Sequence, residues 1–226
     1  MSIRTAVLIH GAGGGGWEFD LWLPVFEKAG VRPVVFDLVP AKGGPESTTF
    51  DDYVEQVRAQ VPRTGRFALI GASLGGILSL KVAEQARPAA LVLVNSVPPA
   101  GVGPPNPSPP YPEIVRWANG PLEETRLAMP DSDEATIQKA WKRWRDESGT
   151  VLNAITKKIP VRKPACPTLV VIGAEDTDIR PTTSVALADW AKADVLRYAG
   201  MSHVGPLLGR RAPEVAGTIV QWLKSR

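Results

Sequence analysis

The chain has 226 residues, of which 44% are hydrophobic, and this length suits one domain or one domain with a modest insertion. Its 26 basic and 23 acidic residues give a net charge of +3, and because both signs are mixed along the chain, this excess indicates no nucleic-acid partner. One cysteine and two histidines exclude an intramolecular disulfide framework and a histidine-rich metal site.

Six short apolar runs, most without polar alternation, predict strands buried on both faces of a parallel sheet. They are Thr5–Ile9, Pro33–Phe36, Phe67–Ile70, Ala90–Val94, Thr168–Ile172 and Val195–Tyr198. Helical patterns lie between them, at Trp17–Ala29, Phe50–Val61, Leu74–Ala86, Thr182–Lys192 and Pro213–Lys224. This alternation predicts an α/β fold, with a mostly parallel sheet of about six strands and helices on both faces.

The alternation stops after the fourth predicted strand. The stretch Pro98–Pro112 is rich in proline, which cannot form a central strand or a helix. A helical block follows, from Glu113 to about residue 159. We therefore expect a helical insertion, residues 98–163, between the two parts of a core domain, residues 1–97 and 164–226.

Within this insertion, one helix can be predicted in more detail. Asp131 and Glu134 have the spacing of a capping box. Ile137, Trp141 and Trp144 then fall on one helical face, which predicts an apolar stripe. We expect the stripe to cover the ends of the strands.

A membrane span needs roughly 18 to 20 consecutive apolar residues, and no stretch approaches that length. The first apolar run, Ala6–Ile9, is too short for the core of a signal peptide. We therefore expect a soluble, cytoplasmic protein with no membrane partner. Nothing in the sequence indicates an oligomeric state.

The glycine run Gly11–Gly16 follows the first strand and allows two interpretations. It matches the G-x-G-x-x-G pattern, and Asp37 ends the next strand, as in a dinucleotide-binding fingerprint of an NAD(P)-dependent oxidoreductase. Alternatively, the loop after His10 presents a backbone N–H group to a developing oxyanion, which requires small residues. None of the three tyrosines is followed by a lysine four residues on, as a short-chain reductase would need.

The segment Gly71–Gly75 matches G-x-S-x-G between a predicted strand and a predicted helix, which is the context that gives this motif its meaning. Ser73 would then be a nucleophile on a strained turn, at the positive end of the helix dipole. The N–H group of Leu74 would be one oxyanion donor.

A serine nucleophile needs a base, and the chain offers only His10 and His203. His203 follows the last predicted strand, at the edge where open α/β sheets bind ligands, and is the better candidate. An acid that orients it should follow the preceding strand, where Glu175, Asp176 and Asp178 compete.

Together, these motifs resemble the α/β-hydrolase superfamily of serine hydrolases. The matching pieces are His10-Gly11 with its glycine loop, the Ser73 turn, Leu91–Ser96, Gly173–Asp176 and Ser202-His203. The resemblance implies that Asp176 is the acid, the N–H of Ala12 the second oxyanion donor, and the insertion a cap over the active site. Pro181 lies five residues beyond Asp176, where the family usually has four, and this keeps Asp178 open.

The sequence His-Gly-Ala followed by a Trp-led helix is most similar to the plant methylesterase and hydroxynitrile lyase branch. The lyases have Thr in place of Gly11 and Lys in place of Val204, so both departures favour hydrolysis. The resemblance implies cleavage of a small, largely apolar carboxylic ester, lactone or thioester through an acyl-enzyme on Ser73, with no cofactor or metal. Lyase-like or cofactor-free perhydrolase chemistry on the same residues stays an alternative. The residues expected to contact substrate are Gly11, Trp17, Trp117, Trp141 and Val204.

Overall fold

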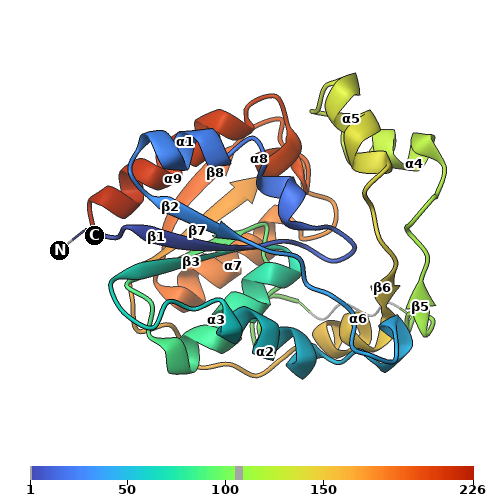
Figure 1. Cartoon of the computed structure of the whole chain (residues 1–226), viewed down its shortest axis with the longest axis horizontal. Helices are drawn as coiled ribbons and strands as arrows, with labels where there is room; N and C mark the ends of the chain where they lie inside the picture. The colour runs from blue at the N-terminus through green and yellow to red at the C-terminus, as the bar shows by residue number, and fades with distance from the viewer. Residues whose placement is uncertain (1, 105–108) are drawn as a thin grey trace.

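The structure is a computed structural model that describes residues 2–104 and 109–226. Residues 105–108, inside the predicted proline-rich stretch, lie outside the described residues. Figure 1 shows a central sheet between two layers of helices, with an additional group of elements at one end. Among the helices that the structure describes, none is both long and apolar enough to cross a membrane.

Six strands form one sheet, in which every neighbouring pair is parallel and the order is β2-β1-β3-β4-β7-β8. The strands are β1 (Thr5–Ile9), β2 (Arg32–Val35), β3 (Phe67–Ala72), β4 (Ala90–Val94), β7 (Thr168–Gly173) and β8 (Asp194–Tyr198). The predicted fold class and all six strands are confirmed. The strands could be predicted accurately because burial on both faces makes each central strand a continuous apolar run.

Alternate residues of one strand enter two different cores. In β1, Ala6 and Leu8 pack into the core beneath one helical layer, whereas Val7 and Ile9 pack into the core beneath the other.

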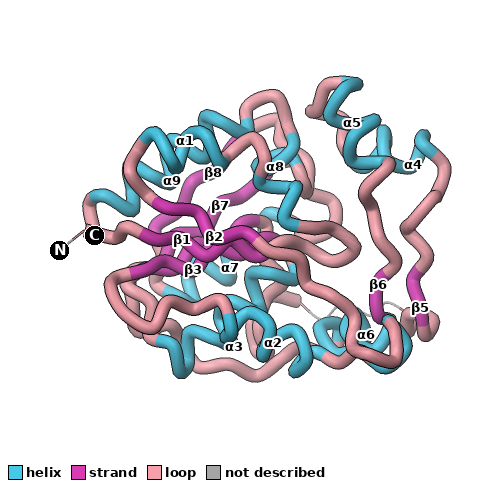
Figure 2. The backbone as a smooth tube through the Cα atoms, in the orientation of Figure 1, coloured by secondary structure: helices cyan, strands magenta, loops and turns pink. Residues whose placement is uncertain are grey.

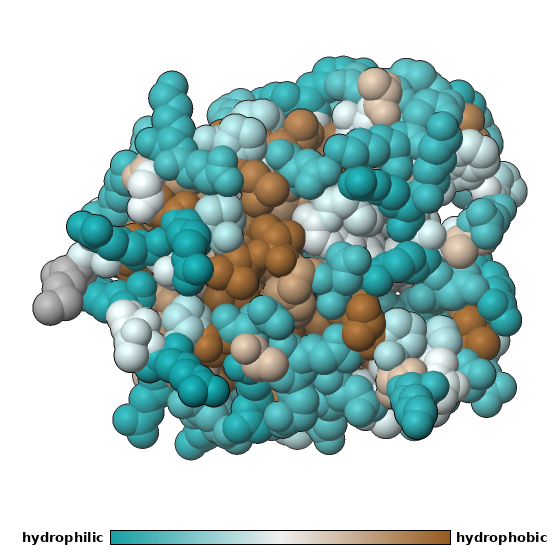
Figure 3. All heavy atoms as spheres, viewed as in Figure 1, coloured by the Kyte–Doolittle hydropathy of each residue, from teal (hydrophilic) through white to brown (hydrophobic). Residues whose placement is uncertain are grey.

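β2 is an edge strand, and its Pro33 is tolerated because an edge position can spare the missing N–H donor. In the view of Figure 3, hydrophobic residues are visible near the middle of the molecule, with mostly hydrophilic residues above and below them.

Helices α1 and α9 cover one face of the sheet, and α2, α3 and α7 cover the other (Figure 1). The helical segments of the core are η1 (Gly16–Phe19), α1 (Leu23–Lys28), η2 (Pro45–Ser47), α2 (Phe50–Ala59), α3 (Leu74–Ala86), α7 (Pro181–Ala191), α8 (Gly205–Leu208) and α9 (Ala212–Lys224). The single helix predicted at Trp17–Ala29 is divided into η1 and α1. Pro24 explains the second start, because proline fits the first turn of a helix.

The insertion contains helices and a small antiparallel sheet. Its elements are β5 (Ile114–Val115), α4 (Leu122–Ala128), α5 (Glu134–Trp141), β6 (Glu147–Ser148) and α6 (Gly149–Thr156). Figure 2 shows this group at the end of the molecule opposite both chain termini, beyond the carboxyl ends of the strands. Only helices were expected here, because two-residue strands carry no periodic pattern that sequence analysis can detect.

Two details predicted for this insertion are wrong. The N-cap of α5 is Asp133, whose side chain accepts the Thr136 N–H at 2.8 Å, so Asp131 and Glu134 form no capping box. The helix ends at Trp141, and Trp144 therefore lies beyond it instead of on its apolar face. The capping pattern misled because Asp131 accepts hydrogen bonds from a distant loop, as described below.

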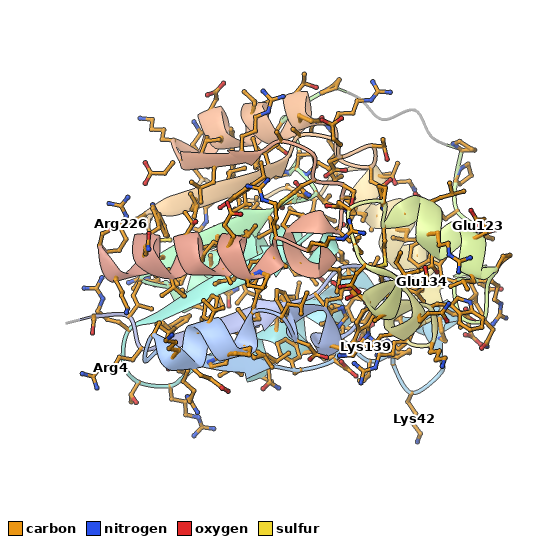
Figure 4. All side chains as sticks on the ribbon, turned by 90° about the horizontal axis from the view of Figure 1, so that it is seen from above. Arg4, Lys42, Glu123, Glu134, Lys139 and Arg226 are labelled. Carbon is orange, nitrogen blue, oxygen red and sulfur yellow. The ribbon has the colours of Figure 1, made fainter. Side chains whose placement is uncertain are left out.

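Exposed ion pairs add little to the attachment of the insertion. Figure 4 shows Glu123, Glu134 and Lys139 on the insertion, far from Arg226 at the other end. Lys139 reaches the core through an ion pair with Asp20 at 2.7 Å, with both side chains well exposed. Such a pair contributes about 0–1 kcal/mol. The buried contacts near the carboxyl ends of the strands therefore matter more.

Candidate active site

Ser73 occupies the turn between β3 and α3 in an unusual backbone conformation, with φ of 50° and ψ of −116°. Such a conformation costs a non-glycine residue about 1–3 kcal/mol, so the surroundings must hold it. The Ser73 N–H donates to the carbonyl of Val94 at 3.0 Å, and its carbonyl accepts the N–H of Val97 at 3.1 Å. The turn is thus fixed against the end of β4, while Ser73 itself lines a cavity.

The glycines of the motif are required by close contacts. A methyl group on Gly71 would lie 2.1 Å from the carbonyl oxygen of Gly75, and one on Gly75 would lie 2.2 Å from that of Ile9. Both distances are far shorter than a carbon–oxygen contact allows. The spacing G-x-S-x-G therefore follows from the tight passage of α3 beside β1 and β3.

His203 follows β8 and is paired with a buried carboxylate. Its Nδ1 atom lies 3.0 Å from Oδ1 and 2.9 Å from Oδ2 of Asp176, whose side chain is completely buried. The N–H groups of Asp178 and Ile179 both donate to Asp176 Oδ1 at 2.9 Å and fix the carboxylate. Burial alone would lower the pKa of His203, but the hydrogen bond and the charge of Asp176 raise it above its usual value.

The two competing acids lie elsewhere. The Asp178 carboxylate is 4.0 Å from the other ring nitrogen of His203, Nε2, and its side chain is 68% exposed. Glu175 is exposed to solvent. The structure therefore places Asp176 at the Nδ1 atom, while Asp178 stands at the cavity wall on the side of Nε2.

Two residues that the sequence analysis did not identify hold the His203 loop. The Asn95 amide donates to the carbonyls of His203 at 2.7 Å and Ser202 at 3.2 Å, and it accepts the Gly173 N–H at 2.8 Å. Asp131, from the insertion, accepts the Ser202 hydroxyl at 2.6 Å and its N–H at 3.2 Å. His203 is thus tied to β4, β7 and the insertion together.

The N–H groups of Ala12 and Leu74 are the candidate oxyanion donors, and neither donates a hydrogen bond to any residue that the structure describes. Leu74 is the first residue of α3, where a helix offers no internal acceptor. Ala12 lines the same cavity as Ser73. Both groups are therefore free to bind a negative oxygen.

The insertion fixes the glycine loop that carries Ala12. The Gly13 N–H donates to Glu147 Oε2 at 2.9 Å, and the Gly13 carbonyl accepts the Arg145 N–H at 2.7 Å. The Arg145 guanidinium also donates to the Gly14 carbonyl at 2.7 Å. Glu147 is buried and accepts the Tyr53 hydroxyl at 2.8 Å. This network connects the insertion, α2 and the glycine loop.

Replacing Glu147 by alanine is expected to lower the free energy of unfolding by about 3 kcal/mol, because the buried donors of Gly13, Tyr53 and Ser148 lose their acceptor. Urea denaturation followed by circular dichroism measures the change. The control is Glu27→Ala on the exposed side of α1, which should change stability by less than about 0.5 kcal/mol. Equal losses for both variants would contradict a structural role for Glu147.

Both ring nitrogens of His10, the other histidine, contact backbone groups. Its Nδ1 atom lies 2.7 Å from the carbonyl of Gly11, and its Nε2 atom accepts the Leu38 N–H at 2.8 Å. Burial lowers the pKa of His10 to about 4, so its ring is neutral at physiological pH. Of the two histidines, His203 is the one that lines the cavity.

Asp37 is also occupied, which disfavours the dinucleotide interpretation. Its Oδ1 atom accepts the Gly16 N–H at 2.7 Å, and its other oxygen lies 3.8 Å from Arg145. The indole of Trp117 covers the glycine loop, since a methyl group on Gly13 would lie 2.3 Å from Trp117 Cε3. A pyrophosphate would have to displace these side chains.

The cavity has a volume of about 340 Å³ and lies between the core and the insertion. Core residues on its wall include Gly11, Ala12, Glu18, Ser73, His203 and Leu207. The insertion contributes mainly apolar groups, namely Trp117, Gly120, Pro121, Ala128 and Trp144, together with Glu124 and Thr125. The arrangement suits a small molecule with a large apolar part.

The residues predicted to contact substrate divide into two groups. Gly11, Trp117 and Val204 line the cavity. Trp17 packs edge to face with Trp144 at a centroid distance of 5.0 Å, and Trp144, not Trp17, lines the cavity. Trp141 donates its indole N–H to the Gly120 carbonyl at 2.7 Å, so it supports the wall instead of forming it.

Glu18, on η1, is a site residue that the sequence analysis missed. Its side chain is buried and lines the cavity near Ser73 and His203. The only signal in the sequence is a single acid between two aromatic residues, Trp17 and Phe19, directly after the glycine run.

The sequence matches a model of the alpha/beta hydrolase family over residues 6–218. A curated relative, norfluorocurarine synthase 1 from Strychnos sp, is 33% identical over 110 residues. That alignment spans 44% of this chain and 41% of the relative, so less than half of the relative's length is matched.

Solved structures with low sequence identity are similar over nearly the whole chain. A pyrethroid hydrolase from Sphingobium faniae is 21% identical with a TM-score of 0.78, covering 98% of each chain. Tomato methylketone synthase I is 16% identical with a TM-score of 0.77, covering 100% of this chain and 99% of the other. A monoacylglycerol lipase from Paleococcus ferrophilus is 18% identical with a TM-score of 0.75, covering 99% and 96%. At these identities, the similarity concerns the fold.

Proposed function

The chain belongs to the alpha/beta hydrolase family, and on this basis we propose that it is a serine hydrolase that cleaves a carboxylic ester through an acyl-enzyme on Ser73. The observation that carries the proposal is that Ser73 and His203 line one cavity while Asp176 contacts the His203 ring. Ser73 stands on a strained turn, His203 lines the same wall, and the buried Asp176 contacts the far side of the imidazole. This is the constellation that activates a serine hydroxyl.

In the first half-reaction, the Ser73 oxygen attacks the ester carbonyl while His203 Nε2 accepts the hydroxyl proton. Asp176 keeps the remaining ring proton on Nδ1 and stabilises the imidazolium. The N–H groups of Ala12 and Leu74 bind the oxyanion, and each such donor contributes about 3 kcal/mol. The tetrahedral intermediate collapses, His203 donates its proton to the alkoxide, and the alcohol leaves.

In the second half-reaction, a water molecule attacks the acyl-enzyme. His203 accepts one proton of the water, the same two N–H groups bind the new oxyanion, and the Ser73 oxygen recovers the proton as the acid leaves. The residues of this chain therefore supply all the groups that hydrolysis requires.

The cavity wall supports a small, largely apolar substrate, since Trp117, Trp144 and Leu207 face it. Carboxylic esters, lactones and thioesters all present the required carbonyl. The relatives named as a pyrethroid hydrolase and a monoacylglycerol lipase favour the ester class for this chain as well. Val204 lines the wall directly after His203, where the lyases have Lys, and this favours hydrolysis over lyase chemistry.

We also propose that residues 98–163 act as a cap over the active site. The segment supplies Trp117 and Trp144 to the cavity wall, and Asp131 and Glu147 bind the two loops beside the catalytic groups. Substrate selection would then depend on the side chains that the insertion presents.

A fluorophosphonate probe tests the nucleophile without knowledge of the substrate. The wild-type chain should be labelled at one position in the tryptic peptide Phe67–Lys81, which contains Ser73 and Ser79. Fragmentation of the peptide should place the label on Ser73. Labelling should be lost in Ser73→Ala and kept in Ser79→Ala, which is the matched control on the helix that follows Ser73.

Labelling that survives Ser73→Ala would overturn the proposed nucleophile. A wild-type chain that neither reacts with the probe nor hydrolyses any short p-nitrophenyl ester or thioester would overturn the proposed hydrolase activity itself.

A further inference from the structure

The cavity contains a buried carboxyl group that the proposed reaction does not use. Glu18 is only 4% exposed and belongs to η1, directly after the glycine loop. A methyl group on Gly11 would lie 3.4 Å from Ser73 Cβ and 3.9 Å from Glu18 Oε2. The carboxyl and the nucleophile are therefore separated by little more than one backbone residue, Gly11.

The glycine loop is closely fitted to this carboxyl. The Gly11 N–H donates to Glu18 Oε2 at 3.3 Å, and Gly11 immediately precedes the candidate oxyanion donor Ala12. A methyl group on Gly14 would lie 1.5 Å from Glu18 Oε1, so a larger residue there would force the Glu18 carboxyl to move. The position of Glu18 is thus coupled to the position of the loop that would bind the oxyanion.

Few charged groups lie near the Glu18 carboxyl. His203 faces it across the cavity, and Arg145 approaches from the insertion, with its guanidinium bound to the Gly14 carbonyl and near Asp37. The other carboxylates on the cavity wall are Asp178 and Glu124, and its lining includes no lysine or arginine among the described residues. Within that part of the chain, Glu18 forms no ion pair.

Burial raises the pKa of Glu18 to about 7, although the Gly11 hydrogen bond, His203 and Arg145 act in the opposite direction. The charge of Glu18 in turn helps to raise the pKa of His203. The protonation of each group therefore depends on the charge of the other.

We propose that Glu18 is a positioning residue of the active site, which holds the oxyanion loop through Gly11 and must be uncharged when the oxyanion forms. This inference rests on the proposed function. A carboxylate at this place would repel the negative charge that develops on the substrate oxygen, because solvent poorly screens a residue that is only 4% exposed. A protonated carboxyl keeps its contact with Gly11 and adds no charge.

The effect of pH on the reaction depends on the protonation of both His203 and Glu18. At low pH both His203 and Glu18 are protonated, and His203 cannot accept the Ser73 proton. At high pH both are deprotonated, and the Glu18 carboxylate opposes the oxyanion. The reaction is therefore fastest at intermediate pH, whereas a triad without this carboxyl keeps its rate as pH rises above the pKa of its histidine.

The experiment measures the second-order rate of fluorophosphonate labelling of Ser73 from about pH 5 to about pH 10, because this probe also places a negative oxygen in the oxyanion site. For the wild type, we expect a bell-shaped profile that falls at least about tenfold between its maximum and about pH 9. Glu18→Gln, which is neutral and of the same shape, should stay within about twofold of its maximum up to that pH. Its rising limb should also move to lower pH, since His203 loses a neighbouring negative charge.

The matched control is Glu27→Gln, an exposed carboxyl on α1, which should keep the wild-type profile. A wild-type rate that remains level up to about pH 9, or a Glu18→Gln profile that still falls there, would overturn the inference. The wild-type profile alone shows whether the rate falls above its maximum, even where the variant fails to fold. A wild-type chain that shows neither Ser73 labelling nor hydrolysis of a short p-nitrophenyl ester or thioester would instead overturn the proposed function, so the two failures can be distinguished.

Discussion

Replacement of Ser73 by alanine is expected to lower kcat for a p-nitrophenyl ester by about 10⁶-fold, with little change in stability. The loss is large because the covalent route disappears, and water must attack the ester without the nucleophile that His203 activates. A residual rate above the uncatalysed reaction should persist, because the N–H groups of Ala12 and Leu74 still bind the oxyanion.

The control for this measurement is Ser79→Ala on α3, the helix that follows Ser73. The Ser79 hydroxyl is buried and donates to the Gly75 carbonyl at 2.7 Å, so its removal perturbs α3 without touching the cavity. We expect kcat to change by less than about threefold and stability by about 1 kcal/mol. A comparable loss of activity in both variants would mean that the helix, and not the hydroxyl of Ser73, is responsible.

The fold could be predicted because its strands are buried on both faces. β4 is buried at every residue, and its apolar run has the same bounds in the sequence prediction as in the structure. The insertion was less predictable, because its elements are short and depend on partners elsewhere. Asp131 illustrates this, since the residue that matched a local capping pattern instead binds Ser202, which is 71 residues away in the chain.

Ser73 and His203 could be identified as candidate site residues from the sequence, because each follows a strand and parallel strands end at one edge of the sheet. The same reasoning could not separate Asp176 from Asp178, which share one loop. Glu18 was missed because its importance arises from burial and from contact with Gly11, neither of which leaves a periodic pattern. Residues in motifs were thus accessible from sequence, whereas residues defined by their surroundings were not.

The insertion contacts the loops on both sides of the candidate site. Asp131 binds the loop of His203, while Glu147 and Arg145 bind the glycine loop next to Ala12. A shift of the insertion would therefore move the proposed base, His203, and one proposed oxyanion donor, Ala12, together. Catalytic geometry is sensitive to displacements of about 1 Å, so changes in the insertion should affect rate as well as substrate choice.

Asp176→Asn is expected to lower kcat by about 10⁴-fold, whereas Asp178→Asn should lower it by less than about tenfold. The Asp176 carboxylate accepts the Nδ1–H proton of His203 at 2.9 Å, and it is itself fixed by the N–H groups of Asp178 and Ile179. An asparagine amide can turn its NH₂ group toward Nδ1, which would place the ring proton on Nε2. In that tautomer, His203 cannot accept the proton of Ser73.

The Asp178 carboxylate lies 4.0 Å from His203 Nε2, but 68% of its side chain is exposed, so solvent screens its charge. Its removal should lower the pKa of His203 slightly and move the rising limb of the rate profile to lower pH, with the maximum nearly unchanged. Steady-state kinetics of both variants over pH, with circular dichroism to verify folding, provide the comparison. A far larger loss for Asp178→Asn than for Asp176→Asn would assign the acid to Asp178 and would mean that the imidazole ring turns during the reaction.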